Sequence, residues 1–110
     1  MGSLLALLVM TSSLDREPIK RVLHSANPQF RRCYEDALKR DDPGLSGKAR
    51  LKISVSESGR VDDVEVEFPI DAPQFTQCLR DVALKLRFLK GVAAYKLIWP
   101  IIFQASDSKP

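Results

Sequence analysis

Two cysteines lie at matching positions in two helix-like stretches, and a strongly alternating hairpin separates them. Cys33 lies three residues after Phe30, and Cys78 lies three residues after Phe75. Residues three apart share a helix face, so each cysteine falls on the apolar side of its helix, where the two sulfurs can meet. The spacing does not fit a CxxC redox motif, and the single His24 completes no zinc site. The pattern leaves open either one disulfide or two unrelated buried thiols.

The stretch from about residue 15 to 40 has the apolar spacing of a helix. Glu17 and Pro18 fall in its first turn, where an acid and a proline are both favoured. Asn27-Pro28 interrupts the run. This pair either caps a second helix or kinks one long helix. We therefore expect a helix over 15–40 with a break or bend near residue 27, ended by residues 41–44.

A further helix is predicted to follow Asp71, which stands where an N-cap residue is favoured, with Gln74 three residues later. Phe75, Cys78 and later apolar residues up to Leu86 form one stripe. We expect this helix to stop before Lys90-Gly91.

The region between the cysteines has the clearest hairpin pattern in the chain. Apolar residues alternate with mainly basic ones over 48–55 and with acidic ones over 63–68, on either side of the turn at 56–59. Period two gives each strand one buried and one solvated face. The solvated face is basic on the first strand and acidic on the second, which favours their pairing. Gly59 supplies the positive φ that the turn needs.

The last predicted strand runs from Tyr95 to Phe103. Its odd-numbered residues share one face with Trp99, and the opposite face carries Ile98 and Ile102 and is unusually apolar. Pro100 cannot donate to a ladder, which indicates an edge strand or a bulge. The order helix, strand, strand, helix, strand predicts an α+β fold, in which two main helices pack on one face of a three-stranded antiparallel sheet.

No residue pattern points to catalysis, to a cofactor or to a metal. His24 falls at an exposed helix position and has no nucleophile to activate. The pairs Asp41-Asp42 and Asp62-Asp63 sit in or beside turns, where carboxylates usually satisfy backbone donors. Seventeen basic and fourteen acidic residues are mixed along the chain, so we expect no nucleic-acid partner. The sequence favours a non-enzymatic protein.

The two ends differ in composition from the middle. Residues 4–10 are all apolar, a run far shorter than the roughly 20 residues that a membrane span requires. They fit a truncated signal or anchor segment, an expression remnant, or a short extra element on the domain. We expect an apolar N-terminal segment at 1–13, one domain at 14–104, a polar tail at 105–110, and no transmembrane span.

A set of short pieces, in order and spacing, is typical of one family. They are Leu14-Asp15-Arg16-Glu17, Cys33-Tyr34-Glu35, Leu45-Ser46-Gly47-Lys48, Ile53-Ser54-Val55, Cys78-Leu79 and Trp99-Pro100-Ile101-Ile102-Phe103. The chain from Leu14 to Phe103 resembles the AgmX/PglI C-terminal domain, a TonB C-terminal-like module of Gram-negative bacteria. Family members carry an aromatic–proline step after the second helix, where this chain has Arg87-Phe88-Leu89-Lys90-Gly91. We therefore expect a different connection to the last strand.

The resemblance implies a periplasmic module that is joined, in longer relatives, to an inner-membrane anchor through a linker. Such modules contact periplasmic or outer-membrane proteins, some of them in gliding or envelope-spanning machinery. The family carries a cysteine at both matched positions, which implies a Cys33–Cys78 disulfide. TonB-like domains take a partner segment onto the last strand. That strand comprises Tyr95, Lys96, Leu97, Ile98, Trp99, Pro100, Ile101, Ile102 and Phe103.

Two functional hypotheses follow. In the first, a periplasmic or outer-membrane protein segment adds to the last strand by β-augmentation. In the second, the chain is a structural homodimer whose edge strands, or whose residues 4–10, pair with a second copy. The first hypothesis, and the second where edge strands pair, depend on an apolar strand with a free edge.

Overall fold

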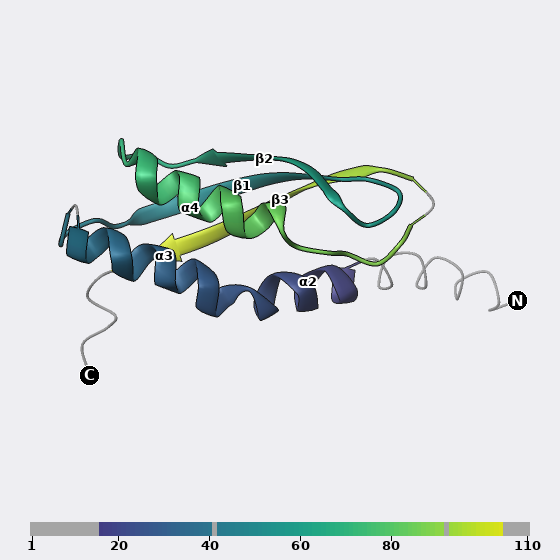
Figure 1. Ribbon diagram of the computed structural model, residues 1–110, viewed down its shortest axis with the longest axis horizontal. Coiled ribbons are helices and arrows are strands. Elements are labelled where there is room, and N and C mark those ends of the chain that lie inside the picture. The colour runs from purple at the N-terminus through teal and green to yellow at the C-terminus, as the bar shows by residue number, and fades with distance from the viewer. Residues whose placement is uncertain (1–15, 41, 92, 105–110) are drawn as a thin grey trace, which may run out of the picture.

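A computed structural model describes residues 16–40, 42–91 and 93–104. The expected segments 1–13 and 105–110, together with Asp15 and Asp41, lie outside the described residues. Within these residues, three helices and a three-stranded sheet form an α+β fold (Figure 1). Their order is α2 (Arg16–Ser25), α3 (Asn27–Arg40), β1 (Gly47–Val55), β2 (Val61–Glu67), α4 (Pro73–Leu84) and β3 (Tyr95–Phe103). The sheet is antiparallel with the order β2-β1-β3, which confirms the predicted architecture.

The predicted break in the first helical stretch is confirmed at Ala26, between α2 and α3. The Ala26 amide donates a hydrogen bond to the Leu23 carbonyl at 3.1 Å, and the Phe30 amide donates to the Ala26 carbonyl at 3.0 Å. Pro28 is the second residue of α3, where the helix has no acceptor to offer a backbone N–H. The proline therefore begins a second helix rather than kinking one long helix.

Helix α4 stops before Lys90-Gly91, as expected, but its N-cap residue and the position of Leu86 differ from the sequence expectation. Ala72, and not Asp71, is its N-cap residue, and no side chain caps it; Pro73 opens the helix with a pre-set φ. The helix ends at Leu84, so Leu86 lies beyond it. The physical reason is a competing interaction, because the Phe88 amide donates to the Gly59 carbonyl at 2.8 Å and draws the chain onto the hairpin turn.

The central strand β1 fixes the register of both neighbours. Leu51 lies opposite Val66 of β2 and opposite Trp99 of β3. Strand β3 has the predicted bounds and pairs with β1 along its whole length. Its side chains alternate between half-buried and exposed up to Phe103, which is buried. The alternation in the sequence thus translates directly into one packed face and one solvent face.

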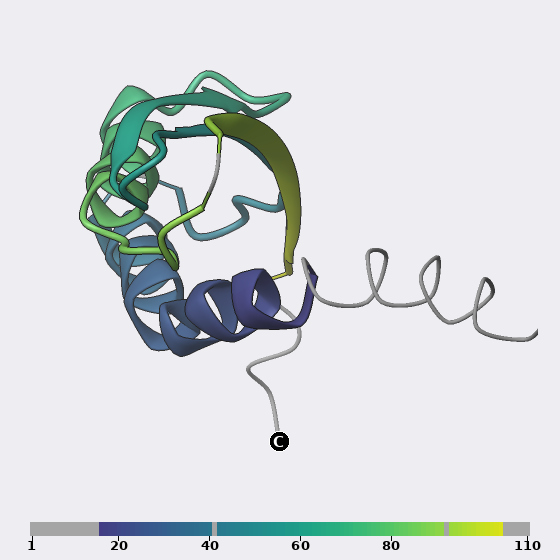
Figure 2. The same ribbon diagram turned by 90° about the vertical axis from the view of Figure 1, so that its right-hand side faces the viewer.

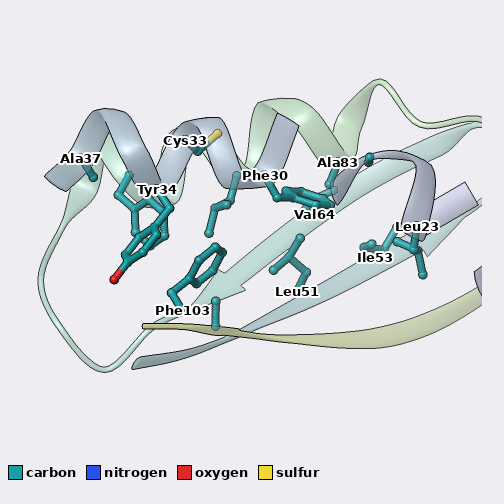
Figure 3. Close-up of a cluster of buried hydrophobic side chains, with 14 of the residues drawn as sticks. Leu23, Phe30, Cys33, Tyr34, Ala37, Leu51, Ile53, Val64, Ala83 and Phe103 are labelled. Atoms are coloured by element: carbon teal, nitrogen blue, oxygen red, sulfur yellow. The ribbon is translucent and has the colours of Figure 1, made fainter. Parts of the chain in front are cut away.

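The helices cover one face of the sheet, and the core lies between these layers. In Figure 2 the sheet curls over the helices, with β3 at one edge and α2 below it. The close-up shows Phe30 and Tyr34 of α3 directed toward Leu51 and Phe103 of the sheet (Figure 3). The largest fully buried side chains are Phe30, Phe75, Leu23, Leu45, Leu51, Ile53, Leu79, Val55 and Val64. Each such burial contributes about 1.5–3 kcal/mol before conformational entropy is counted.

Candidate protein-interaction edge

The two cysteines are brought together between α3 and α4. Their sulfur atoms lie 2.06 Å apart, a disulfide distance, and their Cα atoms lie 5.8 Å apart. Cys33 is 2% exposed, whereas Cys78 is half-buried. The pair therefore joins α3 to α4, the helix that follows the hairpin, as the family resemblance implied.

Strand β3 forms one edge of the sheet. Within residues 16–40, 42–91 and 93–104, it pairs with β1 and with no strand on its other side. The row of side chains on its solvent face is unusually apolar: Ile98 is 52% exposed and Ile102 is 63% exposed. Pro100 stands between them, opposite Arg50 of β1. The edge position predicted from Pro100 is confirmed, and its exposed row is apolar where many edge strands carry charges.

The opposite edge, β2, is covered by a side chain from α4. The Nε atom of Arg80 donates a hydrogen bond to the Val64 carbonyl at 3.0 Å, in a part-buried position. The guanidinium also lies 3.6 Å from the carboxylate of Asp63. A backbone acceptor of β2 is thus already occupied, and acidic side chains line the same strand. The two edges are therefore unequal: β2 is closed at its centre and β3 is open.

Aromatic contacts hold β3 from the helix side. The ring of Trp99 meets the ring of His24 edge-on, with centroids 5.6 Å apart. Phe103 packs against Tyr34 at 4.9 Å and against Phe75 at 5.1 Å. The Tyr34 hydroxyl in turn donates a hydrogen bond to the Leu45 carbonyl. These contacts hold the strand against the helices from its middle to its end.

A groove runs beside the last part of β3, between that strand and α3. We call it the α3–β3 groove. Its walls are Asn27, Phe30, Arg31, Tyr34, Glu35 and Leu38 on α3 and residues 101–104 on the strand side. Phe30 and Phe103 are buried, whereas Arg31 and Glu35 are exposed at the rim. The groove thus combines an apolar floor with a charged rim.

The solvent face of the sheet carries three parallel stripes. Strand β2 is acidic, β1 is basic, and β3 is apolar between Ile98 and Ile102. Lys52 Nζ lies 2.7 Å from Glu67 Oε2. This hydrogen bond raises the pKa of Lys52 and lowers the pKa of Glu67. Lys48 and Arg50 form no ion pair with another described residue, so the basic stripe is only partly neutralised.

Two of the carboxylates expected in or beside turns, Asp42 and Asp63, contact other groups in the structure. The carboxylate of Asp42 accepts a hydrogen bond from the Gly44 amide at 2.9 Å, the turn role expected for it. Asp62 and Asp63 lie within β2 and not in a turn. The turn role expected for Asp63 is wrong, because its carboxylate pairs with Arg80 across the helix–strand interface.

The part of the chain that the structure describes holds no group of three or more His, Cys, Asp or Glu side chains placed to bind a metal. None of the helices formed by these residues is both long and apolar enough to span a bilayer.

Sequence reasoning missed Arg80 and the α3–β3 groove. Arg80 could be assigned to α4 from helical periodicity, but its partner Val64 lies sixteen residues earlier on another element. The groove depends on how far α3 stands from β3, which no local pattern encodes.

No family model, no curated protein and no solved structure matches this chain.

Proposed function

We propose that this chain is a non-enzymatic protein-interaction module that binds an extended segment of a partner protein along β3 by β-augmentation. The observation that carries the proposal is the inequality of the two edges. Arg80 occupies a backbone acceptor on β2, whereas β3 pairs only with β1 among the described residues. An added strand gains main-chain hydrogen bonds at an open edge, and neighbouring side-chain sites supply specificity.

Pro100 indicates which backbone groups the guest would meet. Proline is tolerated in a strand where its missing N–H faces away from the sheet. Alternate residues of an antiparallel strand turn their backbone groups to opposite sides. On this geometry the outward donors are the amides of Lys96, Ile98 and Ile102, with the gap of Pro100 between them. A guest strand would therefore find N–H donors at Lys96, Ile98 and Ile102, and no donor at Pro100.

The compartment we propose is the periplasm. Disulfides persist in oxidising compartments, of which the bacterial periplasm is one, and Cys33 and Cys78 lie at disulfide distance. The resemblance to TonB C-terminal-like modules supports the same compartment. It also supports a role in an envelope-spanning, TonB-like or gliding-motility-type system, with an inner-membrane anchor in a longer native form.

The test selects extended peptides from a random display library against the cysteine-bridged chain and follows their binding by NMR. The expected result is that amide shifts concentrate on residues 95–103. The amides of Lys96, Ile98 and Ile102 should also become protected from hydrogen exchange. Shifts confined to another surface would contradict the proposal.

A matched pair of variants sharpens this test. Ile98→Lys combined with Ile102→Lys should weaken peptide binding, because it places two charges on the apolar row of the open edge. Asp62→Lys puts the same new charge on exposed β2 and should leave binding unchanged. Unaltered binding by a folded double variant would remove β3 as the site.

A second copy of the chain is the other occupant that the exposed apolar row favours. Sedimentation of the chain alone at several concentrations separates the two cases. A monomer throughout the range supports a foreign partner, and a concentration-dependent dimer weakened by the double variant supports homodimerisation.

A further inference from the structure

We infer that the solvent face of the sheet binds an acidic amphipathic helix of a partner protein, which lies lengthwise over β1 and β3. This surface differs from the open edge of β3, because a helix there contacts side chains on the face and leaves the backbone groups of the edge unpaired. The inference therefore goes beyond the proposed function and stands or falls independently of it.

The apolar half of the inference comes from a row of side chains on β3. Ile98 is 52% exposed and Ile102 is 63% exposed, and Pro100 between them is exposed as well. The described helices all lie on the opposite side of the sheet (Figure 2), so none of them covers this row. Large apolar side chains gain free energy when a partner removes them from water.

The acidic half comes from cations that run beside the apolar row. Lys48 lies opposite Ile102 on the neighbouring strand. Arg50 lies opposite Pro100, and Lys96 adds a third cation on β3 itself. None of these three cations forms an ion pair with another described residue. The face is therefore complementary to a partner that carries an apolar row and an acidic row side by side.

An amphipathic helix presents two such rows at the required size. Strand β3 has nine residues and so spans about 30 Å, which is the length of a helix of about 20 residues. A helix is about 10 Å wide, which covers β3 and β1 at a strand spacing of about 4.8 Å. Its backbone groups are paired within the helix, so it can rest on side chains without burying unpaired donors or acceptors.

An anionic membrane surface fits this face less well. The residues with cross-strand partners include four cations and three acids on this side of the sheet: Lys48, Arg50, Lys52 and Lys96, and Asp63, Glu65 and Glu67. The sheet also curls over the helices, so its outer side is convex across the strands (Figure 2). A flat anionic surface that met all three strands would gain little from charges that nearly cancel. A narrow helix can follow the apolar and basic rows alone and avoid the acids of β2.

The experiment compares three labelled peptides of about 20 residues with the same row of leucines at helical spacing. The adjoining row is glutamate, glutamine or lysine. Fluorescence anisotropy measures binding to the cysteine-bridged chain, and circular dichroism measures the helicity of each peptide. At about 50 mM salt we expect the glutamate peptide to bind about fivefold more tightly than the glutamine peptide, and the lysine peptide to bind more weakly than both. At about 500 mM salt the differences should shrink. Equal binding of the three peptides at low salt would overturn the inference.

Two double variants that remove the same charge test the place of the site. Lys48→Gln with Arg50→Gln should reduce the preference for glutamate over glutamine to less than about twofold. Arg31→Gln with Arg32→Gln removes two exposed cations from α3, on the other side of the sheet, and should leave a preference of at least about threefold. Circular dichroism and urea denaturation show whether both variants keep the fold. Equal losses in the two double variants would reduce the effect to net charge and overturn the assignment to this face.

NMR separates this face from the open edge. The glutamate peptide should shift the signals of residues 48–52 and 96–102 while the amides of Lys96, Ile98 and Ile102 keep their hydrogen-exchange rates. Protection of those three amides would mean that the peptide had added to β3 as a strand. That outcome overturns the present inference and supports the proposed function.

The remaining occupants have readouts of their own. We expect no binding of the chain to phosphatidylglycerol vesicles and no dimer that depends on the basic row. Vesicle binding that Lys48→Gln with Arg50→Gln abolishes would assign the face to a lipid surface. A dimer that the same double variant dissociates, measured by sedimentation, would assign the face to a second copy. Either result would overturn the inference of a partner helix.

Discussion

The backbone of Phe88 lies directly against Gly59. A β-carbon on Gly59 would stand 2.1 Å from the Phe88 carbonyl oxygen, and the Phe88 amide donates to the Gly59 carbonyl at 2.8 Å. The backbone of the hairpin turn is therefore in close, hydrogen-bonded contact with the backbone of the segment that follows α4. Since that segment leads into β3, the turn also helps to position the open edge.

Gly59→Ala should be strongly destabilising for two reasons. Gly59 has a φ of 91°, and the added carbon would collide with backbone and not with a movable side chain. We expect a loss of about 2–3 kcal/mol or more in the free energy of unfolding, measured by urea denaturation. Gly44→Ala is the control, because its nearest neighbour would be a side-chain oxygen at 3.6 Å. A Gly59 variant as stable as the Gly44 variant would show that the contact is not rigid.

Removing the cysteine bridge should weaken the fold. The two residues are 45 apart in sequence, and closing a loop of that size contributes about 4 kcal/mol in the chain-entropy model. Cys33→Ser combined with Cys78→Ser should lower the urea midpoint accordingly. Reductant should lower the midpoint of the native chain by a similar amount and leave the double variant unaffected. A native chain indifferent to reductant would indicate that no covalent bond forms.

Arg80→Ala should open the second edge of the sheet. Its hydrogen bond to the Val64 carbonyl is part-buried, and its loss should cost about 1–2 kcal/mol of stability. The unpaired acceptor should also increase self-association at high protein concentration, seen by sedimentation. Asp63→Ala removes only the exposed ion pair and should cost less than about 1 kcal/mol. Equal costs would assign the effect to charge and not to the covered carbonyl.

The exposed pair Lys52–Glu67 should give a small, salt-sensitive pH dependence. The hydrogen bond from Lys52 lowers the folded-state pKa of Glu67. The pair therefore stabilises the fold above the ordinary glutamate pKa of about 4.3, and this contribution disappears as the pH falls through the lowered value. Melting temperatures between about pH 6 and pH 3 at low salt measure it. Glu67→Gln should remove this part of the decline, and an unchanged curve would show that the pair contributes nothing.

The sequence predicted the elements that depend on local pattern. The period-two alternation placed β3 at Tyr95–Phe103, and the isolated Pro100 marked it as an edge. The early end of α4 could not be read in the same way, because Leu86 continues the apolar stripe. The helix stops because the Gly59 carbonyl captures the Phe88 amide, a contact between distant segments.

Some features of the candidate site could be predicted from local sequence pattern, and others depend on tertiary packing. The strand that forms it was visible in the sequence, because alternation and proline are local signals. The covered β2 edge was not, because Arg80 reaches Val64 only after α4 has packed on the sheet. The rim position of Arg31 likewise follows from the path of α3 past β3. Non-local packing thus decides which of two edges is open.

Pro100 has a consequence for how copies of this chain behave when crowded. Pro100 interrupts the row of backbone N–H donors on the edge strand β3. A fibril of identical chains that pair through this edge would therefore lack the same hydrogen bond at every layer. Fibril growth through this border is disfavoured. A single bound segment lacks only one hydrogen bond. The missing donor at Pro100 also favours one register of that segment over the others.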